Sequence, residues 1–441
     1  MKKRLSVFFT CLIALTLAVV MASGCSFIDG NSRSRRAASP SDSEIAAQSV
    51  NFETTPKTRD IEDAFIAAVA KVKRTSVQIL TDSSAGSGVI VDISFAEESN
   101  AAWKQDEDML YIITCHHMVS VSGSYGTQGV GEIEIRLPDE DCSYTNANYV
   151  FHGYIGNKEP SYYASQGYAI TLVGGDFESD IAVLKLDLDK AAHSGKKLSQ
   201  ENKAKIQKAQ IPDDSYNVSL GETVFSIGNP TGTLPGSVAR GIISCLNRSV
   251  DVDEIGAMSL MQIDVSTNPG SSGGGLYNLY GELIGITNAG NTNYTNINFA
   301  IPCYLANDNG FVDIVKQLGG TASEDNYGYV SGRRVKLGFS VMENDDDSES
   351  PFLYVSSVGS GSLAYGKLQA NDVIKTVSVS KNGEEILSRS VSTLDEFAEV
   401  MVMLEAGDVL TISASRYSWG RTKNITADIE IQSFWFCDTG Y

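Results

Sequence analysis

Residues 268–276, NPGSSGGGL, place two serines between glycines, directly before an apolar segment. A nucleophilic serine needs a tight backbone that exposes its hydroxyl, with N–H groups directed at the point where an oxyanion forms. Glycines on both sides permit such a turn. Taken alone, the same composition is more typical of an ordinary loop, so the interpretation depends on what the rest of the chain supplies.

A pair of histidines ends an apolar segment at residues 113–119, ITCHHMV. Imidazole suits the role of general base for a serine hydroxyl because its pKa lies near working pH. A histidine pair is also compatible with a metal site. However, neighbours on an extended chain point to opposite faces, and the other histidines, His152 and His193, lack flanking ligand patterns. We therefore expect neither a metal nor a cofactor.

An acid, Asp180, stands directly before the apolar segment 181–184, IAVL. A carboxylate that orients a histidine must be held rigidly and largely out of water. Aspartate also occurs at strand starts for reasons of turn geometry alone.

Short β-branched segments recur between residues 73 and 302, separated by Gly, Asn, Asp and Ser clusters and without long helices. This pattern favours antiparallel barrels or a sandwich. The segments are residues 77–80, 88–91, 110–113, 133–135, 181–184 and 283–286.

The order His, Asp, Ser on an all-β background matches the chymotrypsin-type arrangement. Across residues 60–320 the chain resembles a trypsin-like serine protease of the HtrA/Deg family. The resemblance also rests on residues 86–90 (GSGVI), 227–230 (IGNP), 241–244 (GIIS) and 299–302 (FAIP).

This resemblance implies a mainly β fold, with a chymotrypsin-like double six-stranded β-barrel followed by a small α+β domain. It makes His117 the base, Asp180 the orienting acid and Ser272 the nucleophile. The histidine register follows from Thr114, three residues before His117. The N–H groups of Gly270 and Ser272 would form the oxyanion hole. Protein or peptide substrates are implied, and a homotrimer is the assembly that the resemblance suggests.

The chain departs from the family pattern at several points. Cys115 and His116 replace the usual Asn pair, and Gly275 stands where Pro usually follows the glycine pair. We expect Gly275 to soften the loop, which would allow a resting form with a disordered oxyanion hole. The long interval before Asp180 is interpreted as an extended surface loop. Contact with a partner is one explanation of its tyrosines, but a half-buried strand pair that packs through tyrosine is favoured. Its tyrosines are Tyr144, Tyr149, Tyr154, Tyr162, Tyr163 and Tyr168.

Ser266 lies six residues before Ser272, where trypsin-type enzymes place an acid at the base of the primary pocket. Because no carboxylate stands there to receive a basic side chain, we expect cleavage after small or medium apolar residues.

Residues 330–441 indicate a second module. Lys336, Leu337, Gly338 and Phe339 resemble the carboxylate-binding loop of PDZ domains, which implies C-terminal peptides as partners. A capping box at Thr393 predicts a helix that ends at Gly407. The alternative is a small α+β domain without a peptide groove. Residues 343–349, ENDDDSE, are interpreted as a solvated loop.

The N-terminus predicts an anchor. A basic start and an apolar run lead to residues 22–25, ASGC, which resemble the lipobox of bacterial lipoproteins. We therefore expect a signal peptide at residues 1–24, lipid on Cys25, and a flexible tether over residues 25–59. This places the chain on the extracytoplasmic face of a bacterial membrane. An ordinary secreted signal is the alternative.

The 441-residue chain carries 54 acidic and 34 basic side chains, a net charge of -20, which disfavours nucleic acid as a partner. Two non-enzymatic alternatives remain: a binding or chaperone-like module on the same fold, and a surface adhesin.

Overall fold

The structure is a computed structural model that describes residues 56–97, 108–123, 126–156, 158–214, 216–252, 256–290, 296–305, 310–332, 337–344, 351–359 and 362–433. The expected signal peptide, the lipidation site Cys25 and nearly all of the tether lie outside these residues. Within the described ranges, no helix is both long enough and apolar enough to cross a bilayer.

The first part of the described chain forms a closed barrel of antiparallel strands, apart from a single parallel contact between β7 and β8. Most of its strand residues are apolar or β-branched, and many of the apolar ones are buried in a shared core. Around the barrel, the strands are β1 (Ser76–Thr81), β2 (Ala85–Val91), β3 (Met109–Thr114), β9 (Ile181–Asp187), β8 (Ile170–Asp176), β7 (Val150–Ile155) and β6 (Gly131–Arg136).

This barrel has seven strands where six were expected. The additional strand is β7, in the tyrosine-rich interval that was interpreted as a surface loop. It pairs along its length with β6 and meets β8 at Gly153 and Ile170. A Cβ on Gly153 would lie 2.5 Å from the Ile170 Cβ, so this close approach requires glycine.

The tyrosines of the interval pack against one another and against the barrel. Tyr154 stacks on Tyr163 with ring centroids 5.5 Å apart, and Tyr163 is buried. The hydroxyl of the buried Tyr144 donates to the backbone oxygen of Ser76. Packing through tyrosine therefore accounts for the composition. The interval also holds a short helix, α5 (Pro160–Ser165).

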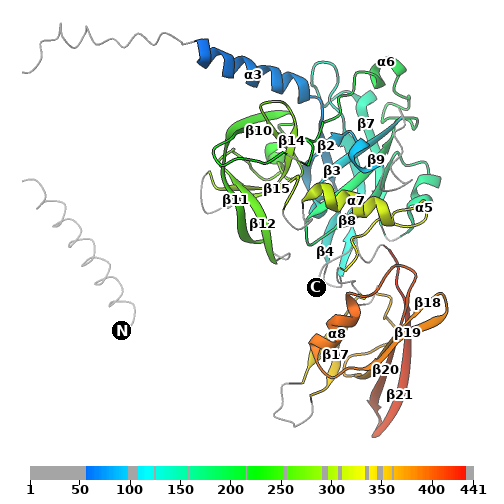
Figure 1. The fold of residues 1–441 in the computed structure, drawn as a ribbon. Helices are drawn as coiled ribbons and strands as arrows, with labels where there is room; N and C mark the ends of the chain where they lie inside the picture. Colours follow the sequence, from blue (N-terminus) through cyan, green and yellow to red (C-terminus); the bar gives the residue numbers. More distant parts are fainter. Residues whose placement is uncertain are drawn as a thin grey trace, which may run out of the picture. The chain divides into compact units, whose positions relative to one another are not determined.

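A second closed barrel follows, and its core is continuous with that of the first. Figure 1 shows the two barrels side by side, with α7 (Phe311–Thr321) lying over β8 of the first. Helix α3 (Pro56–Val72) precedes the first barrel in the chain and packs on the second through Phe65 and Phe225. The second barrel runs in the order β10 (Thr223–Gly228), β11 (Ser237–Val252), β12 (Gly256–Ile263), β15 (Asn298–Pro302), β14 (Leu283–Gly290) and β13 (Gly275–Asn278). The shorter elements are α4 (Ser94–Glu97), β4 (Ser120–Gly123), β5 (Gly126–Gly129) and α6 (Gln200–Lys203).

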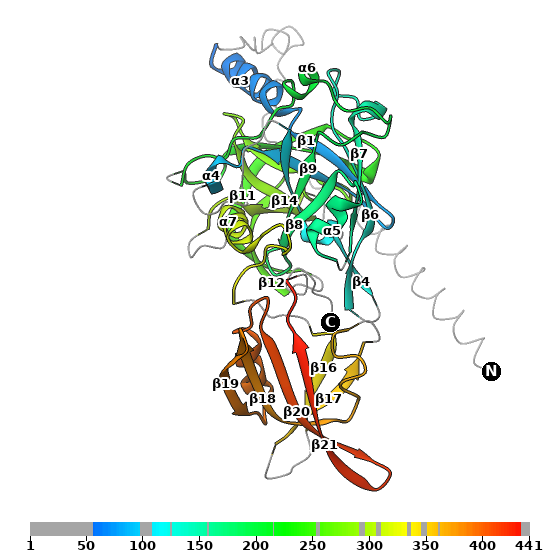
Figure 2. The ribbon, with the colours of Figure 1, turned by 90° about the vertical axis from the view of Figure 1, so that its right-hand side faces the viewer.

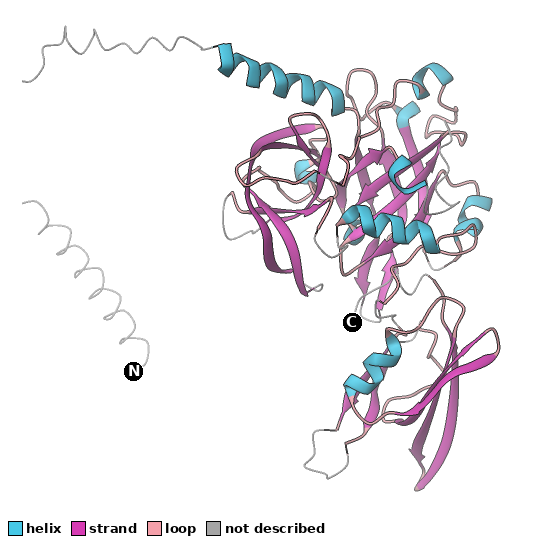
Figure 3. Ribbon diagram, in the orientation of Figure 1, coloured by secondary structure: helices cyan, strands magenta, loops and turns pink. Residues whose placement is uncertain are grey.

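The C-terminal residues fold around a separate core and contain a sheet and one helix. Figure 2 shows β18, β20 and β21 side by side, and Figure 3 shows that strands outweigh helices in the described chain. The elements are β16 (Phe339–Glu343), β17 (Leu353–Val358), β18 (Val373–Lys381), β19 (Glu384–Ser390), α8 (Leu394–Met401), β20 (Val409–Ser418) and β21 (Arg421–Glu430).

The expected capping box is present at the start of α8. The Thr393 hydroxyl accepts the Glu396 N–H, and the Glu396 carboxylate accepts the Thr393 N–H. The helix ends at Met401, earlier than expected, and Gly407 lies beyond it in a turn with φ +94°. The predicted fold class, a mainly β double barrel followed by a small α+β module, is confirmed.

Candidate active site

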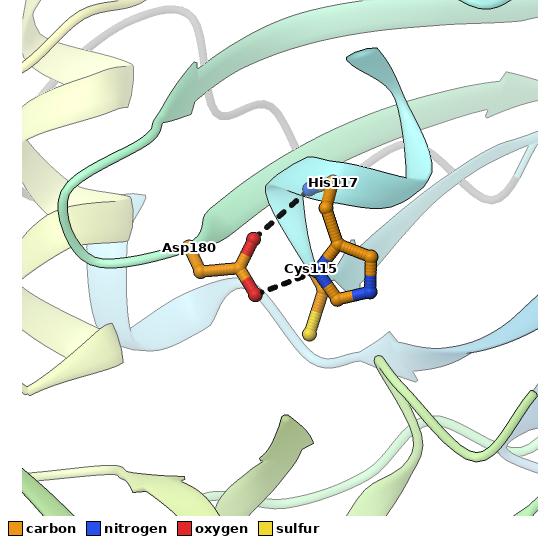
Figure 4. Close-up of side chains that lie close together, drawn as sticks. All are labelled: Cys115, His117 and Asp180. Atoms are coloured by element: carbon orange, nitrogen blue, oxygen red, sulfur yellow. Dashed lines mark hydrogen bonds and ion pairs between the residues drawn. The ribbon is translucent and has the colours of Figure 1, made fainter. Parts of the chain in front are cut away.

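His117 and Asp180 are joined by two hydrogen bonds at the ends of strands of the first barrel. The backbone N–H of His117 donates to Asp180 Oδ1 at 2.9 Å, and His117 Nδ1 lies 2.8 Å from Asp180 Oδ2. Figure 4 shows the carboxylate facing both groups. The side chain of Asp180 is 1% exposed and that of His117 is 48% exposed. The acid is thus shielded from water, whereas the imidazole ring is accessible to it.

The backbone holds Asp180 in place. It adopts φ +53°, a conformation that aspartate tolerates better than most residues, in the turn before β9. Its carbonyl accepts the N–H of His116, and the preceding Ser179 N–H donates to the carboxylate of Asp176. The acid therefore has little freedom to turn away from the imidazole.

The two groups shift each other's pKa. Burial acts to lower the pKa of His117, but the charge of Asp180 and their hydrogen bond outweigh it and raise that pKa above its ordinary value. Burial acts to raise the pKa of Asp180, but His117 outweighs it through charge and hydrogen bonding, and the pKa is lowered. The pair therefore favours ionised aspartate beside an imidazole with increased affinity for a proton.

Asn288, in β14, was not predicted and contacts both the acid and the expected nucleophile. Its side-chain Nδ2 donates to Asp180 Oδ2 at 2.6 Å, and it is buried. Its backbone carbonyl accepts the hydroxyl of Ser272 at 2.8 Å. Asn288 of the second barrel thus supplies a third hydrogen-bond donor to the Asp180 carboxylate, and its backbone carbonyl holds the Ser272 hydroxyl.

The loop that carries Ser272 lies at the start of β13. Throughout the described residues, no hydrogen bond joins Ser272 to His117, because the serine hydroxyl is bonded to Asn288. The structure therefore joins His117 and Asp180 by direct hydrogen bonds. It connects Ser272 to Asp180 through Asn288.

Two backbone donors of this loop are open. Across the described chain, the N–H groups of Gly270 and Ser272 have no hydrogen-bond partner. The carbonyl of Pro269 accepts the Thr231 N–H at 2.7 Å, which fixes the peptide unit that contains the Gly270 N–H. Gly270 adopts φ +97°, and a Cβ there would clash with the Asn229 carbonyl oxygen. Glycine is thus required for this turn.

Comparison with known proteins supports the same chemistry. A family model described as "Trypsin-like peptidase domain" matches residues 86–286. The chain is 27% identical to "Serine protease Do-like HtrB" of Bacillus subtilis over 409 residues, 88% of this chain and 74% of that protein. It is 26% identical to "Serine protease HtrA-like" of Staphylococcus epidermidis over 385 residues, 85% of this chain and 58% of that protein.

A third relative, "Probable periplasmic serine endoprotease DegP-like" of Pseudomonas savastanoi pv. phaseolicola, is 34% identical over 229 residues, 49% of this chain and 40% of that protein. The chain is thus similar to HtrA-type serine proteases over most of its length, and residues 86–286 match a trypsin-like peptidase domain. The predicted resemblance to HtrA-type proteases and the predicted enzyme class, a serine endopeptidase, are confirmed.

The site is joined across the two barrels by Ser87, whose role the sequence did not reveal. Ser87 is fully buried in β2. Its hydroxyl donates to the Gly270 carbonyl at 2.8 Å and accepts the Asn229 N–H at 2.7 Å, and its backbone N–H donates to the Ser272 carbonyl at 2.9 Å. One residue of the first barrel thus bonds the serine loop of the second.

Gly275 does not soften the loop, contrary to expectation. It is buried at the start of β13 and pairs with Ile227 and Ile286. A Cβ on Gly275 would clash with the hydroxyl oxygen of the buried Tyr277. The glycine therefore provides space for the tyrosine ring within an ordered strand.

Cys115 lies beside the acid and the imidazole in Figure 4. Its Sγ, a ring nitrogen of His117 and a carboxylate oxygen of Asp180 all lie within 4.8 Å of one another, which are donor types suited to zinc. However, burial and the charge of Asp180 raise the pKa of the Cys115 thiol well above its ordinary value. The carboxylate already accepts three hydrogen bonds from His117 and Asn288. The cluster therefore favours proton handling over metal binding.

The second histidine of the pair is directed elsewhere. His116 is buried, its Nδ1 lies 3.1 Å from the Ser120 hydroxyl, and its ring packs edge-on against Phe177. Its side chain makes a structural contact on the opposite side of the strand end.

The remaining predicted residues lie apart from the triad contacts. Ser266 is exposed. Leu337 is buried in the C-terminal core, Gly338 adopts φ +67°, and Phe339 begins β16 with its ring 6.4 Å from that of Phe397 on α8. Lys336 lies outside the described residues.

Proposed function

We propose that the chain hydrolyses peptide bonds through an acyl-enzyme, with Ser272 as nucleophile, His117 as general base and Asp180 as the orienting acid. The observation that carries this is the buried Asp180 carboxylate bonded to a half-exposed imidazole. The alignment with trypsin-like peptidases covers all three residues. Asp180 would fix the His117 tautomer and stabilise the imidazolium that forms during attack.

Attack requires the Ser272 hydroxyl to leave the Asn288 carbonyl and donate to His117. The exchange loses one ordinary hydrogen bond and gains another, so its net cost is small, about 1 kcal/mol or less. His117 then takes the proton as Oγ attacks the scissile carbonyl. The unpartnered N–H groups of Gly270 and Ser272 would receive the oxyanion.

We further propose that the substrates are misfolded or regulatory proteins and that residues 330–441 form a PDZ-like module that captures apolar C-termini. Support comes from β16, which pairs only with β17 among the described strands and so leaves one edge open for an added peptide strand. The N–H groups of Leu337 and Gly338 have no partner in the described part of the module.

The placement that we propose is extracytoplasmic, with the protease domain at residues 60–320 tethered by residues 25–59 to lipid on Cys25. Residues 22–25, ASGC, and the relatives named as periplasmic support it. Mass analysis of the chain tests the anchor: wild type should carry lipid and Cys25→Ser should not. An unlipidated wild-type chain would contradict the anchor and leave the proteolytic proposal intact.

A non-catalytic binding protein on the same fold is the second candidate, favoured by the hydrogen bond that keeps Ser272 on Asn288 instead of His117. Labelling with a fluorophosphonate separates the two, because this reagent reacts only with an activated serine. Labelling of wild type but not of Ser272→Ala supports the protease. Absence of labelling in both would favour the binding protein.

A further inference from the structure

His152 and His193 meet on the surface of the first barrel. They are two of the four histidines in the chain and are 41 positions apart. His152 Nε2 and His193 Nδ1 lie 2.9 Å apart, with ring centroids 5.1 Å apart and ring planes tilted by 50°. At this distance each nitrogen directs its in-plane N–H or lone pair at the other. The two rings are therefore joined by an N–H···N hydrogen bond, at a point where a cation could take the place of the proton.

A carboxylate adjoins this pair. Glu134 and His152 face each other across β6 and β7, and Glu134 Oε2 lies 3.7 Å from His152 Nε2. Zinc bonds of about 2.0 to 2.2 Å in a tetrahedral site place neighbouring ligand atoms about 3.3 to 3.5 Å apart. The separation of 2.9 Å between His152 Nε2 and His193 Nδ1 is shorter than this range, and the separation of 3.7 Å between Glu134 Oε2 and His152 Nε2 is longer. The ligand atoms of Glu134, His152 and His193 do not all lie within 4.8 Å of one another in the described structure, so the Glu134 side chain has to rotate toward His193 to complete the set.

The backbones that carry the three residues are fixed. His152 lies within β7, and its carbonyl accepts the N–H of Ala169. The N–H of His193 donates to the Val150 carbonyl at 2.7 Å, which ties the loop after β9 to the start of β7. Both imidazoles are exposed, so water could complete the coordination. A preorganised backbone with exposed side chains is what an exchangeable metal site requires.

We propose that Glu134, His152 and His193 bind a divalent transition-metal ion of the zinc class. Two neutral imidazoles and one carboxylate are the protein ligands of established zinc sites. The ion would join β6, β7 and the loop after β9, so it would stabilise the barrel at its additional strand. Arg136, whose Nε lies 2.6 Å from Glu134 Oε1, leaves Oε2 for the ion but moderates affinity through its own charge.

Isothermal titration of the full chain with zinc chloride tests the proposal, using untagged protein stripped with a chelator. We expect one zinc ion per chain and a rise in Tm, since a ligand that binds the folded state stabilises it. His152→Ala and His193→Ala should each weaken binding by at least about tenfold, because even residues that only orient metal ligands contribute that much. Bound Cu²⁺ should show hyperfine coupling to two imidazole nitrogens.

Matched variants distinguish binding at these three residues from binding elsewhere on the chain. Glu132→Gln removes the same charge from an exposed position two residues along β6 and should leave binding unchanged, whereas Glu134→Gln should weaken it. His117→Ala should also leave binding unchanged. Equal affinity in wild type and His193→Ala, or loss of binding in His117→Ala instead, would overturn the proposal. His193→Gln, which retains a hydrogen-bonding side chain, repeats the test if His193→Ala is unstable.

Discussion

The hydroxyl of Ser272 donates to the backbone carbonyl of Asn288 at 2.8 Å. The same residue donates its side-chain amide to Asp180. Asn288 therefore contacts the acid and the serine at once, while the imidazole contacts only the acid. Catalysis requires the serine hydroxyl to exchange one neighbour for the other.

The roles of the two adjacent histidines can be separated by substitution. His117→Ala and Ser272→Ala should each abolish fluorophosphonate labelling almost completely, because triad residues act as a unit and their losses do not add. His116→Ala should keep most of the labelling rate, since the ring of His116 contacts Ser120 and Phe177, whereas His117 bonds the carboxylate directly. Labelling retained by His117→Ala and lost in a folded His116→Ala would show that the histidine register is wrong.

The rate of labelling should depend on pH through His117. Since the pKa of His117 is raised by Asp180, the rate should rise with pH and reach half its maximum above the usual imidazole pKa of about 6.5. Asp180→Asn should move this midpoint to lower pH and reduce the maximal rate on the order of 10⁴-fold. A wild-type midpoint below the ordinary imidazole value would contradict the coupling.

The same pair predicts how stability depends on pH. The stabilisation from the raised His117 pKa is fully present below the unfolded imidazole pKa and is lost as pH rises through the folded value. The stabilisation from the lowered Asp180 pKa is present above the unfolded carboxyl pKa and is lost as pH falls through the folded value. Denaturant unfolding should therefore show the largest difference between wild type and His117→Ala in mildly acidic solution.

Asn288 should act as a positioning residue. Asn288→Ala removes a hydrogen bond to a charged group worth about 1.5 to 3 kcal/mol, so kcat should fall about 10- to 100-fold with KM little changed. Asn278→Ala is the matched control, since that buried amide lies in the same barrel and bonds to Tyr216, Tyr280 and Glu282, which are not part of the triad. The pH midpoint should shift in Asn288→Ala, and stay unchanged in Asn278→Ala, if the asparagine acts through Asp180. An equal loss of kcat in both variants would indicate a general structural effect.

Ser266 predicts the specificity of cleavage. With a serine in place of an acid, a peptide library should be cut after small or medium apolar residues, with discrimination of about 10- to 200-fold per methylene. Ser266→Asp should increase cleavage after Lys or Arg, and Thr267→Asp serves as the neighbouring control. Cleavage by wild type chiefly after basic residues would refute the assignment.

The C-terminal module should recognise free carboxylates. Calorimetry with peptides that end in apolar residues should show binding to the full chain, and amidation of the C-terminus should abolish it, because backbone N–H groups would receive the carboxylate. Any effect of the peptide on labelling of Ser272 should correspond to about 1 to 3 kcal/mol of coupling. Equal binding of both peptide forms, or of neither, would contradict a PDZ-like role.

Sequence motifs predicted most of the structural features that depend on residues close together in the chain. The capping box at Thr393 is visible because its partners lie within one helical turn. Asn288 was missed because it meets Asp180 across 108 positions, through the docking of two barrels that no local motif encodes. The seventh strand was missed for a related reason, since β7 closes the barrel through a contact at Gly153 that tyrosine composition does not indicate.

Ser87 of the first barrel hydrogen-bonds the serine loop of the second, so activity depends on this joint between the barrels. The imidazole and its acid come from one barrel and the serine loop from the other, so each half can keep its own sheet while the reacting atoms separate. On heating, hydrolysis should therefore cease once the joint loosens, before the strands themselves unfold. Heat would then act first on the alignment of the reacting groups and only afterwards on the strands that carry them.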